Sequence, residues 1–210
     1  MKKLITLLLA LLLCAAGCQK TVTDDAPAPT QAVSGEAEKT PPPSGLAETA
    51  PQAAAEPIPY AFTFSAETLE GERVTEEYFG RFELTMVNVW ASWCGPCKSE
   101  LGELASLYGR LPETVGFLSI TMDDPRDLKE AKALLAENGC TFPCLDAQSS
   151  SGLFQNFLGK VTAIPTTVFF DSRGNQVGDW MLGVPQGGGS VSDAYLGQIQ
   201  ARLDRLSNGQ

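Results

Sequence analysis

The sequence contains no histidine among its 210 residues. Histidine is the commonest metal ligand in proteins, so its absence argues against a zinc centre and against a copper-delivery protein. Positive charge is also scarce: 15 Lys and Arg residues stand against 25 Asp and Glu residues, which gives a net charge of −10 at pH 7. This acidic balance argues against nucleic acid as a partner and against electrostatic adsorption to anionic lipid.

Long hydrophobic runs are missing as well. An apolar run at residues 4–16 follows Lys2 and Lys3, and it is shorter than the roughly 20 residues that a membrane span needs. It is typical of a signal-peptide core, so we assign residues 1–17 to a signal peptide. Small residues before Cys18 suit a cleavage point, and ordinary secretion would leave this cysteine free. They also resemble a bacterial lipobox, with Ala15 where Leu is more usual, and we expect Cys18 to be lipidated.

The segment that follows Cys18 has almost no large apolar side chains. Ala, Pro, Thr, Glu and Ser dominate it up to residue 59. Such a composition cannot bury enough surface to offset the entropy lost on ordering. We therefore expect residues 18–59 to form a lipid anchor with a disordered linker. Residues 60–210 show no internal repeat and are numerous enough for one domain with its own core.

The domain alternates between strand and helix patterns. A hairpin is predicted at residues 62–64 and 70–74, with Glu70-Gly71 at its turn. The remaining predicted elements are a short helix at 75–79, strands at 84–90 and 114–121 on either side of a helix through 100–108, a helix capped by Asp124-Pro125 and ended by Gly139, a strand at 142–145, a short helix at 153–158, strands at 166–170 and 176–182, and a helix at 191–206. The order is βαβ, then an extra αβ, then ββα, which indicates an α/β fold.

Two cysteines lie at the junction between the strand at 84–90 and the helix that follows. Cys94 stands close to the first helical residues and Cys97 about one turn further on, with Gly95 and Pro96 between them. The free N–H groups and the dipole of a helix N-terminus favour a thiolate at Cys94. Cys97 is placed to resolve a mixed disulfide by attacking the Cys94 sulfur. Half of a zinc site or a structural disulfide are the alternatives for such a pair.

The stretch around these cysteines resembles known proteins. Trp93-Cys94-Gly95-Pro96-Cys97-Lys98 resembles the thioredoxin active site, and residues 88–100 resemble the TlpA/ResA-like branch of membrane-tethered, extracytoplasmic thiol-disulfide oxidoreductases. The resemblance implies a thioredoxin fold with an N-terminal β-hairpin extension and an inserted αβ unit in the central sheet. It also implies substrate contacts from the residues around the cysteines and from a proline loop: Trp93, Gly95, Pro96, Ile164 and Pro165.

Pro165 and Glu100 are further candidates. Because most bonds before proline are trans, Pro165 on its own is expected to be a trans proline that begins a strand. The resemblance instead implies a cis proline packed against the cysteines. Glu100 follows Cys97 by three residues and shares its helical face. If that face is turned inward, burial raises the pKa of Glu100 and the carboxyl group can shuttle a proton for Cys97. Otherwise Glu100 is a solvated carboxylate in the first turns of the helix.

Cys140 and Cys144 form a second pair whose state the sequence leaves open. In an extended strand their Cα atoms lie about 13 Å apart, beyond the roughly 7 Å that a disulfide tolerates, but a turn at Phe142-Pro143 closes that gap. Buried thiols, a structural disulfide and an accessory redox pair all fit the spacing. A copper chaperone favours such a pair but also needs a histidine, which this sequence lacks.

The sequence thus favours an enzyme that reduces protein disulfides, anchored by lipid at the outer face of a bacterial cell membrane. We expect no metal, no bound cofactor and no nucleic-acid partner. The resemblance implies oxidised client proteins such as apocytochrome c and a membrane electron donor of the DsbD/CcdA type. A thiol peroxidase is the main alternative, although Ala91 stands where a peroxiredoxin has the threonine of its Thr-x-x-Cys pattern. A non-catalytic or copper-delivery lipoprotein is the third.

Overall fold

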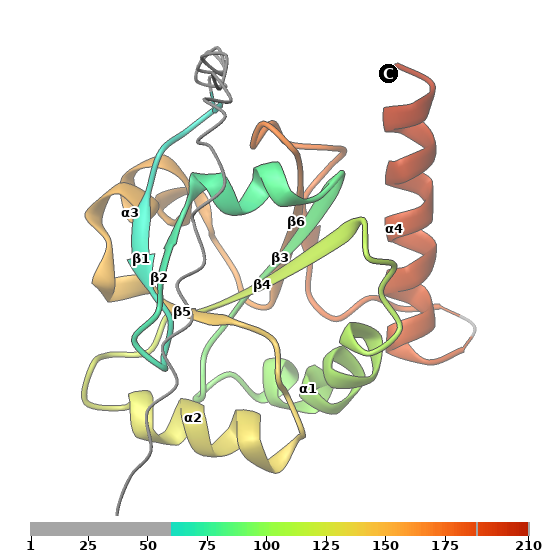
Figure 1. Cartoon of the computed structure of the whole chain (residues 1–210). Helices are drawn as coiled ribbons and strands as arrows, with labels where there is room; N and C mark the ends of the chain where they lie inside the picture. Colours follow the sequence, from blue (N-terminus) through green and yellow to red (C-terminus); the bar gives the residue numbers. More distant parts are fainter. Residues whose placement is uncertain (1–59, 188, 210) are drawn as a thin grey trace, which may run out of the picture. The chain divides into compact units, whose positions relative to one another are not determined.

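The computed structural model describes residues 60–187 and 189–209. The expected signal peptide and the expected anchor and linker lie outside the described residues. A five-stranded mixed sheet with the order β5-β4-β3-β6-β7 forms the centre of the fold. In Figure 1, α1 and α2 lie together below the sheet, α4 runs along its right side, and α3 lies on the left with the β1–β2 hairpin. Within the described part, no helix has the length and apolar character needed to cross a membrane.

The element order agrees with the predicted thioredoxin fold. The described elements are β1 (Ser65–Glu67), β2 (Arg73–Thr75), the 3-10 helix η1 (Glu76–Arg81), β3 (Leu84–Trp90), α1 (Gly95–Tyr108), β4 (Val115–Thr121), α2 (Leu128–Glu137), β5 (Cys144–Asp146), the 3-10 helix η2 (Ala147–Ser149), α3 (Ser151–Asn156), the 3-10 helix η3 (Leu158–Lys160), β6 (Thr166–Asp171), β7 (Met181–Leu182) and α4 (Val191–Ser207). β3, α1 and β4 form the parallel βαβ unit, β6 pairs antiparallel with β3, and the inserted α2–β5 unit extends the sheet beside β4.

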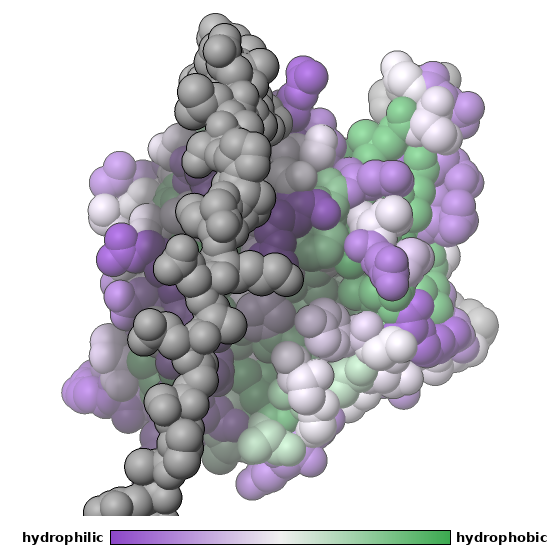
Figure 2. Space-filling model, viewed as in Figure 1, coloured by the Kyte–Doolittle hydropathy of each residue, from purple (hydrophilic) through white to green (hydrophobic). Residues whose placement is uncertain are grey.

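Alternating side chains of the central strands face two separate hydrophobic clusters, because successive residues of a strand point to opposite faces. Met86 and Trp90 of β3 belong to the cluster that also contains α1 and α4 residues. Val87 and Val89 belong to the cluster beneath the hairpin and α3. α4 contributes Tyr195 to the first of these clusters. Figure 2 shows hydrophobic residues where α4 meets the rest of the fold and hydrophilic residues on its outer side.

The N-terminal hairpin exists, but its first strand lies later than predicted. β1 pairs with β2 from Ser65 opposite Thr75 to Glu67 opposite Arg73, whereas residues 62–64 were expected to form that strand. Phe64 does not pair with β2, because its N–H donates to Glu76 Oε2 at 3.0 Å and its ring packs among other aromatic rings. The predicted helix at 75–79 is the 3-10 helix η1.

The start of α2 was predicted wrongly. Asp124 does not cap the helix, because its carboxylate accepts the backbone N–H of Arg126 at 3.0 Å and binds the Arg126 side chain. Residues 124–127 form a turn, closed by Asp127 N–H donating to the Asp124 carbonyl at 2.8 Å. The helix therefore begins at Leu128 rather than beside Pro125.

The last strand is also shorter than predicted. Only Met181 and Leu182 form β7, although Gln176 makes an isolated bridge to β6. Gly178 has a positive φ of 75°, which turns the chain away from the sheet. The buried guanidinium of Arg202 in α4 then binds two carbonyl groups of this segment, those of Val177 and Asp179, at 3.1 Å each. These carbonyls are therefore bound by α4 instead of by a strand.

Candidate active site

The connection from β3 to α1 places Cys94 at the start of the helix. Its N–H donates to the Ala91 carbonyl at 3.1 Å, which closes a tight turn after β3. Cys94 then occupies the N-cap position of α1, and its sulfur accepts the N–H of Cys97 at 3.2 Å. Pro96 lies in the first turn of the helix, where its missing N–H leaves no partner unsatisfied. The Cys94 sulfur therefore lies at the N-terminus of the helix, where it binds an N–H group that has no partner within the helix.

Cys94 and Cys97 form a disulfide, with an S–S distance of 2.01 Å and Cα atoms 5.3 Å apart. Cys94 retains 6% of its surface exposed, whereas Cys97 is completely buried. A thiol or disulfide of another protein therefore has access to Cys94 but not to Cys97. This difference agrees with the assignment of Cys94 as nucleophile and Cys97 as resolving thiol, and these roles remain predictions.

A proline loop lies against the disulfide. The Ile164–Pro165 peptide bond is cis, as the resemblance implied, and the Ile164 carbonyl oxygen lies 3.7 Å from the Cys94 sulfur. The Pro165 carbonyl accepts the N–H of Gly183 at 2.8 Å. This hydrogen bond ties the loop to the residue that follows β7. The backbone of the loop lies beside the Cys94 sulfur.

The other predicted contact residues border the same sulfur on the outside. Gly95 and Pro96 are exposed at the start of α1, and Ile164 is half-buried. Trp93, which precedes Cys94, has 67% of its surface exposed. An indole ring so exposed beside a reactive cysteine offers apolar contact area to an approaching polypeptide. Their role in substrate binding remains a prediction.

Glu100 points inward, as the functional interpretation of its spacing required. Its side chain is 1% exposed, and its two oxygens accept hydrogen bonds from Asn88 Nδ2 at 3.1 Å and from the Tyr195 hydroxyl at 3.0 Å. Burial raises the pKa of Glu100 to about 7, against the lowering effect of the two hydrogen bonds. A carboxyl group of this pKa can take up and release a proton near neutral pH.

Sequence reasoning missed a second buried carboxylate next to the active-site turn. Asp123 has no exposed surface, and it accepts the N–H of Ser92 at 2.9 Å and the Ser92 hydroxyl at 2.6 Å. The hydroxyl of Thr121 also donates to it. Asp123 thus fixes the turn that presents Cys94. The available signal was an acidic residue two positions after the end of the apolar strand β4.

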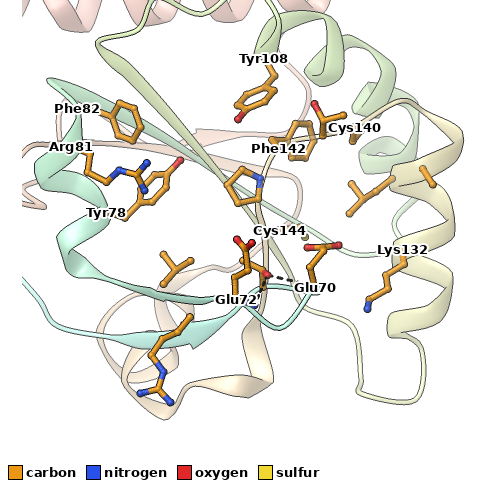
Figure 3. Close-up of a pocket in the computed structure, with 17 residues that line it drawn as sticks. Glu70, Glu72, Tyr78, Arg81, Phe82, Tyr108, Lys132, Cys140, Phe142 and Cys144 are labelled. Atoms are coloured by element: carbon orange, nitrogen blue, oxygen red, sulfur yellow. Dashed lines mark hydrogen bonds between the residues drawn. The ribbon is translucent and has the colours of Figure 1, made fainter. Parts of the chain in front are cut away.

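Cys140 and Cys144 are free thiols in the structure. Burial raises the pKa of Cys140 to about 11 and that of Cys144 to about 12, so neither forms a reactive thiolate readily. They line a pocket of about 620 Å³ together with the aromatic and charged residues Tyr78, Arg81 and Lys132 (Figure 3). Of the three interpretations of this pair, the structure agrees best with thiols that are not paired, of which Cys144 is buried and Cys140 half-buried.

Similarity to a protein family covers most of this site, although Tyr195 lies outside the matched residues. The model of the AhpC/TSA family matches residues 58–176, which is more than half of the chain. The chain belongs to the AhpC/TSA family. The matched region runs from the hairpin through β6, and it includes the disulfide, Glu100 and the cis proline.

Individual relatives point to one branch of such proteins. This AhpC/TSA-family chain is 33% identical over 108 residues to the thiol:disulfide interchange protein DsbE homolog of Paracoccus denitrificans, a match covering 51% of this chain and 56% of that protein. It is 30% identical over 90 residues to the thiol-disulfide oxidoreductase ResA of Oceanobacillus iheyensis, covering 42% and 44%. The chain therefore spans about half the length of these curated relatives.

Solved structures confirm the fold. The structure of a thiol:disulfide interchange protein of the thioredoxin family from Chlorobium tepidum matches with a TM-score of 0.54 and 23% sequence identity, covering 72% of this chain and 99% of that one. This match shows the fold, and the relatives above confirm the resemblance to TlpA/ResA-like proteins.

Proposed function

We propose that this protein is a thiol-disulfide oxidoreductase that reduces disulfides of other proteins through Cys94 and Cys97. The observation that carries the proposal is the disulfide at the N-terminus of α1, beside the cis-proline loop, in which Cys94 keeps some exposed surface and Cys97 keeps none. Its relatives in Paracoccus denitrificans and Oceanobacillus iheyensis bear names of the same class of enzyme.

The reaction starts from the dithiol form. The Cys94 thiolate attacks one sulfur of the client disulfide, forms a mixed disulfide and releases the other client sulfur as a thiolate. Cys97 then gives its proton to ionised Glu100, and its thiolate attacks the Cys94 sulfur. This step closes the Cys94–Cys97 disulfide and releases the second client thiolate. Two electrons pass to the client, the protein is oxidised to the form seen in the structure, and a separate electron donor must reduce it again.

The surroundings of the disulfide support each step. The helix N-terminus stabilises the Cys94 thiolate that attacks the client disulfide. The cis-proline loop offers backbone groups to an extended client segment, and Trp93, Gly95 and Pro96 offer exposed contact surface. Glu100 supplies a proton acceptor inside the protein, where bulk water does not reach Cys97.

Location and partners extend this proposal beyond the described residues. The signal-peptide pattern and Cys18 support an extracytoplasmic protein tethered to the membrane by lipid. Proteins outside the cytoplasm meet an oxidising environment, so a reducing enzyme there needs electrons from across the membrane. The resemblance to TlpA/ResA-like proteins supports a donor of the DsbD/CcdA type and clients such as oxidised apocytochrome c.

Two parallel assays test the proposed function. We expect the protein to accelerate reduction of insulin by dithiothreitol and to consume hydrogen peroxide no faster than the Cys94→Ser variant does. Insulin offers accessible disulfides, whereas a thiol peroxidase reacts with peroxide at a single cysteine. Rapid peroxide consumption that depends on Cys94, without insulin reduction, would identify a peroxidase and overturn the proposal.

The role of Glu100 gives a prediction on pH dependence. With a pKa of about 7, Glu100 is ionised above that pH and accepts the Cys97 proton, so the exchange rate should rise as pH passes through about 7. Glu100→Gln keeps the shape and removes this step. We expect exchange near neutral pH to slow by up to roughly 100-fold, the lower end of what general acid–base catalysis contributes.

The same variant should also change the thiols. Ionised Glu100 repels a nearby thiolate, so its removal should lower the pKa of Cys94 or Cys97, measured by the pH profile of alkylation. Glu103→Gln, on the same helix but bound to the N–H of Ser192 at 3.1 Å, is the matched control and should behave like the parent. If Glu100→Gln also exchanges at the parental rate with unchanged thiol titration, Glu100 has no part in the reaction.

A further inference from the structure

The carboxyl group of Glu100 is part of a closed ring of buried hydrogen bonds. Asn88 of β3 and Tyr195 of α4 each donate to one of its oxygens, at 3.1 and 3.0 Å. Thr167 of β6 completes the ring, because its hydroxyl accepts from Asn88 Nδ2 at 3.2 Å and lies 3.2 Å from the Tyr195 hydroxyl. Asn88 and Thr167 are direct partners across β3 and β6. Four elements thus meet around one titrating group.

The Tyr195 hydroxyl can serve Glu100 in both of its protonation states. When Glu100 is ionised, Tyr195 donates to it and accepts from Thr167. When Glu100 holds a proton, the carboxyl group donates to the Tyr195 oxygen, and Tyr195 turns its own hydrogen to Thr167. Either member of the Tyr195–Thr167 pair can be the donor, so neither state leaves the Glu100 carboxyl without a partner.

We propose that Tyr195 and Thr167 form a hydroxyl chain that reverses its direction when Glu100 takes up or releases the Cys97 proton. Tyr195 is then a positioning residue, which acts through Glu100. The proton moves only between Cys97 and Glu100, and the two hydroxyl hydrogens rotate without leaving their oxygens. The inference deepens the proposed function and rests on the role given there to Glu100.

Few titratable or charged groups surround Glu100 in the described part of the structure. Tyr195 is the titratable group that faces it from α4, and Cys97 precedes it by three residues on α1, while Asn88 of β3 and Thr167 of β6 carry no charge. Burial and then the nearby Glu100 raise the pKa of Tyr195 well above its usual value, so this hydroxyl stays protonated at neutral pH. No charged side chain of the described part shifts the pKa of Glu100.

The hydroxyl chain predicts that substitutions of Tyr195 and Thr167 shift the Glu100 titration midpoint in opposite directions. A hydrogen bond to an ionised carboxylate is roughly twice as strong as one between neutral groups, so Tyr195→Phe should destabilise ionised Glu100 more than the protonated form. We expect the midpoint of the Glu100 titration to rise by about one pH unit. Thr167→Val removes the acceptor that Tyr195 needs when Glu100 is protonated, and it leaves Asn88 Nδ2 wholly to Glu100. The midpoint should then fall.

The experiment is a carbon-13 NMR titration of the Glu100 side-chain carboxyl in the oxidised protein, with Glu100→Gln used to assign the signal. Thr167→Ser keeps the hydroxyl and should restore the parental midpoint. Tyr108→Phe removes a phenol that lies outside the ring and should leave the midpoint unchanged. Because a general loosening of the core would shift both variants in the same direction, the opposite signs distinguish the chain from a structural role.

The outcomes test the hydroxyl chain separately from the proposed role of Glu100. An unchanged midpoint in Tyr195→Phe, or a rise in Thr167→Val, overturns the hydroxyl chain. If Tyr195→Phe does not fold, the difference between Thr167→Val and Thr167→Ser decides, and equal midpoints for these two variants overturn it. The titration needs no enzymatic turnover. Suppose that the midpoint rises in Tyr195→Phe and falls in Thr167→Val, while Glu100→Gln exchanges disulfides at the parental rate. The reversing hydroxyl chain would then stand, and the proposed role of Glu100 in the reaction would be rejected.

Discussion

Cys97→Ser is expected to accumulate covalent complexes with client proteins, whereas the parental protein should accumulate almost none. The Cys94 thiolate still attacks a client disulfide, but the mixed disulfide is no longer resolved by an internal thiol. The complexes should appear on non-reducing gels of extracts and disappear on treatment with dithiothreitol. Cys94 supplies the bond because it alone of the pair reaches the surface.

Cys94→Ser is the matched control, and it should trap no client. The other thiol of the pair, Cys97, is completely buried and cannot meet a disulfide of another protein. Cys140 and Cys144 should not substitute, because burial raises the pKa of both thiols to about 11 and 12. Complexes that form through Cys97 in the Cys94→Ser variant would reverse the assignment of the two roles.

Cys18→Ala is expected to release the protein from the membrane or to stall it as a precursor. The prediction follows from the small residues that precede Cys18 and from the basic and apolar start of the chain. In the proposal, lipid attached to Cys18 anchors the protein to the membrane. Loss of this cysteine should therefore remove lipid labelling and move the protein out of the membrane fraction. Cell fractionation with fatty-acid labelling measures both effects.

Cys14→Ala is the control for this prediction. It removes a cysteine from the same apolar run but not from the expected cleavage point, so labelling and fractionation should match the parental protein. If Cys18→Ala remains in the membrane fraction to the parental extent, the lipid anchor is wrong and another part of the chain holds the protein there.

The core of the candidate site could be predicted because its signals are local. The apolar strand, the Gly95-Pro96 break and the helical spacing after it lie within one short stretch, and they place Cys94 at a helix N-terminus. The i to i+3 spacing likewise placed Glu100 on the face of Cys97. The structure agrees with both placements, since Cys94 is the N-cap of α1 and Glu100 is buried.

The partners of these residues could not be predicted, because the fold brings them together from distant positions. Tyr195 lies 95 positions from Glu100, and in the sequence it reads only as an apolar position of a helix. Asp123 lies 31 positions from Ser92, and nothing local to either residue indicates that they meet. Such contacts depend on which strands pair and which helix covers them.

The mistaken boundaries have the same origin. Asp124-Pro125 is a good local start for a helix, yet the Asp124 carboxylate binds Arg126 and the chain turns once more before α2 begins. The strand predicted at 176–182 is interrupted because Arg202, from a different element, binds two of its carbonyl groups. In both places a side-chain contact outweighs the local pattern.

The reduction potential of the Cys94/Cys97 couple tests most directly whether this protein is a reductant. It is measured by equilibrating the purified protein with dithiothreitol or glutathione buffers of known poise and quantifying the dithiol fraction. Gly95 and Pro96 are the residues that thioredoxin also carries between its cysteines, so we predict a potential near the thioredoxin value of about −270 mV. A potential near the value of about −120 mV that belongs to the strong oxidant DsbA would contradict the proposed reductase.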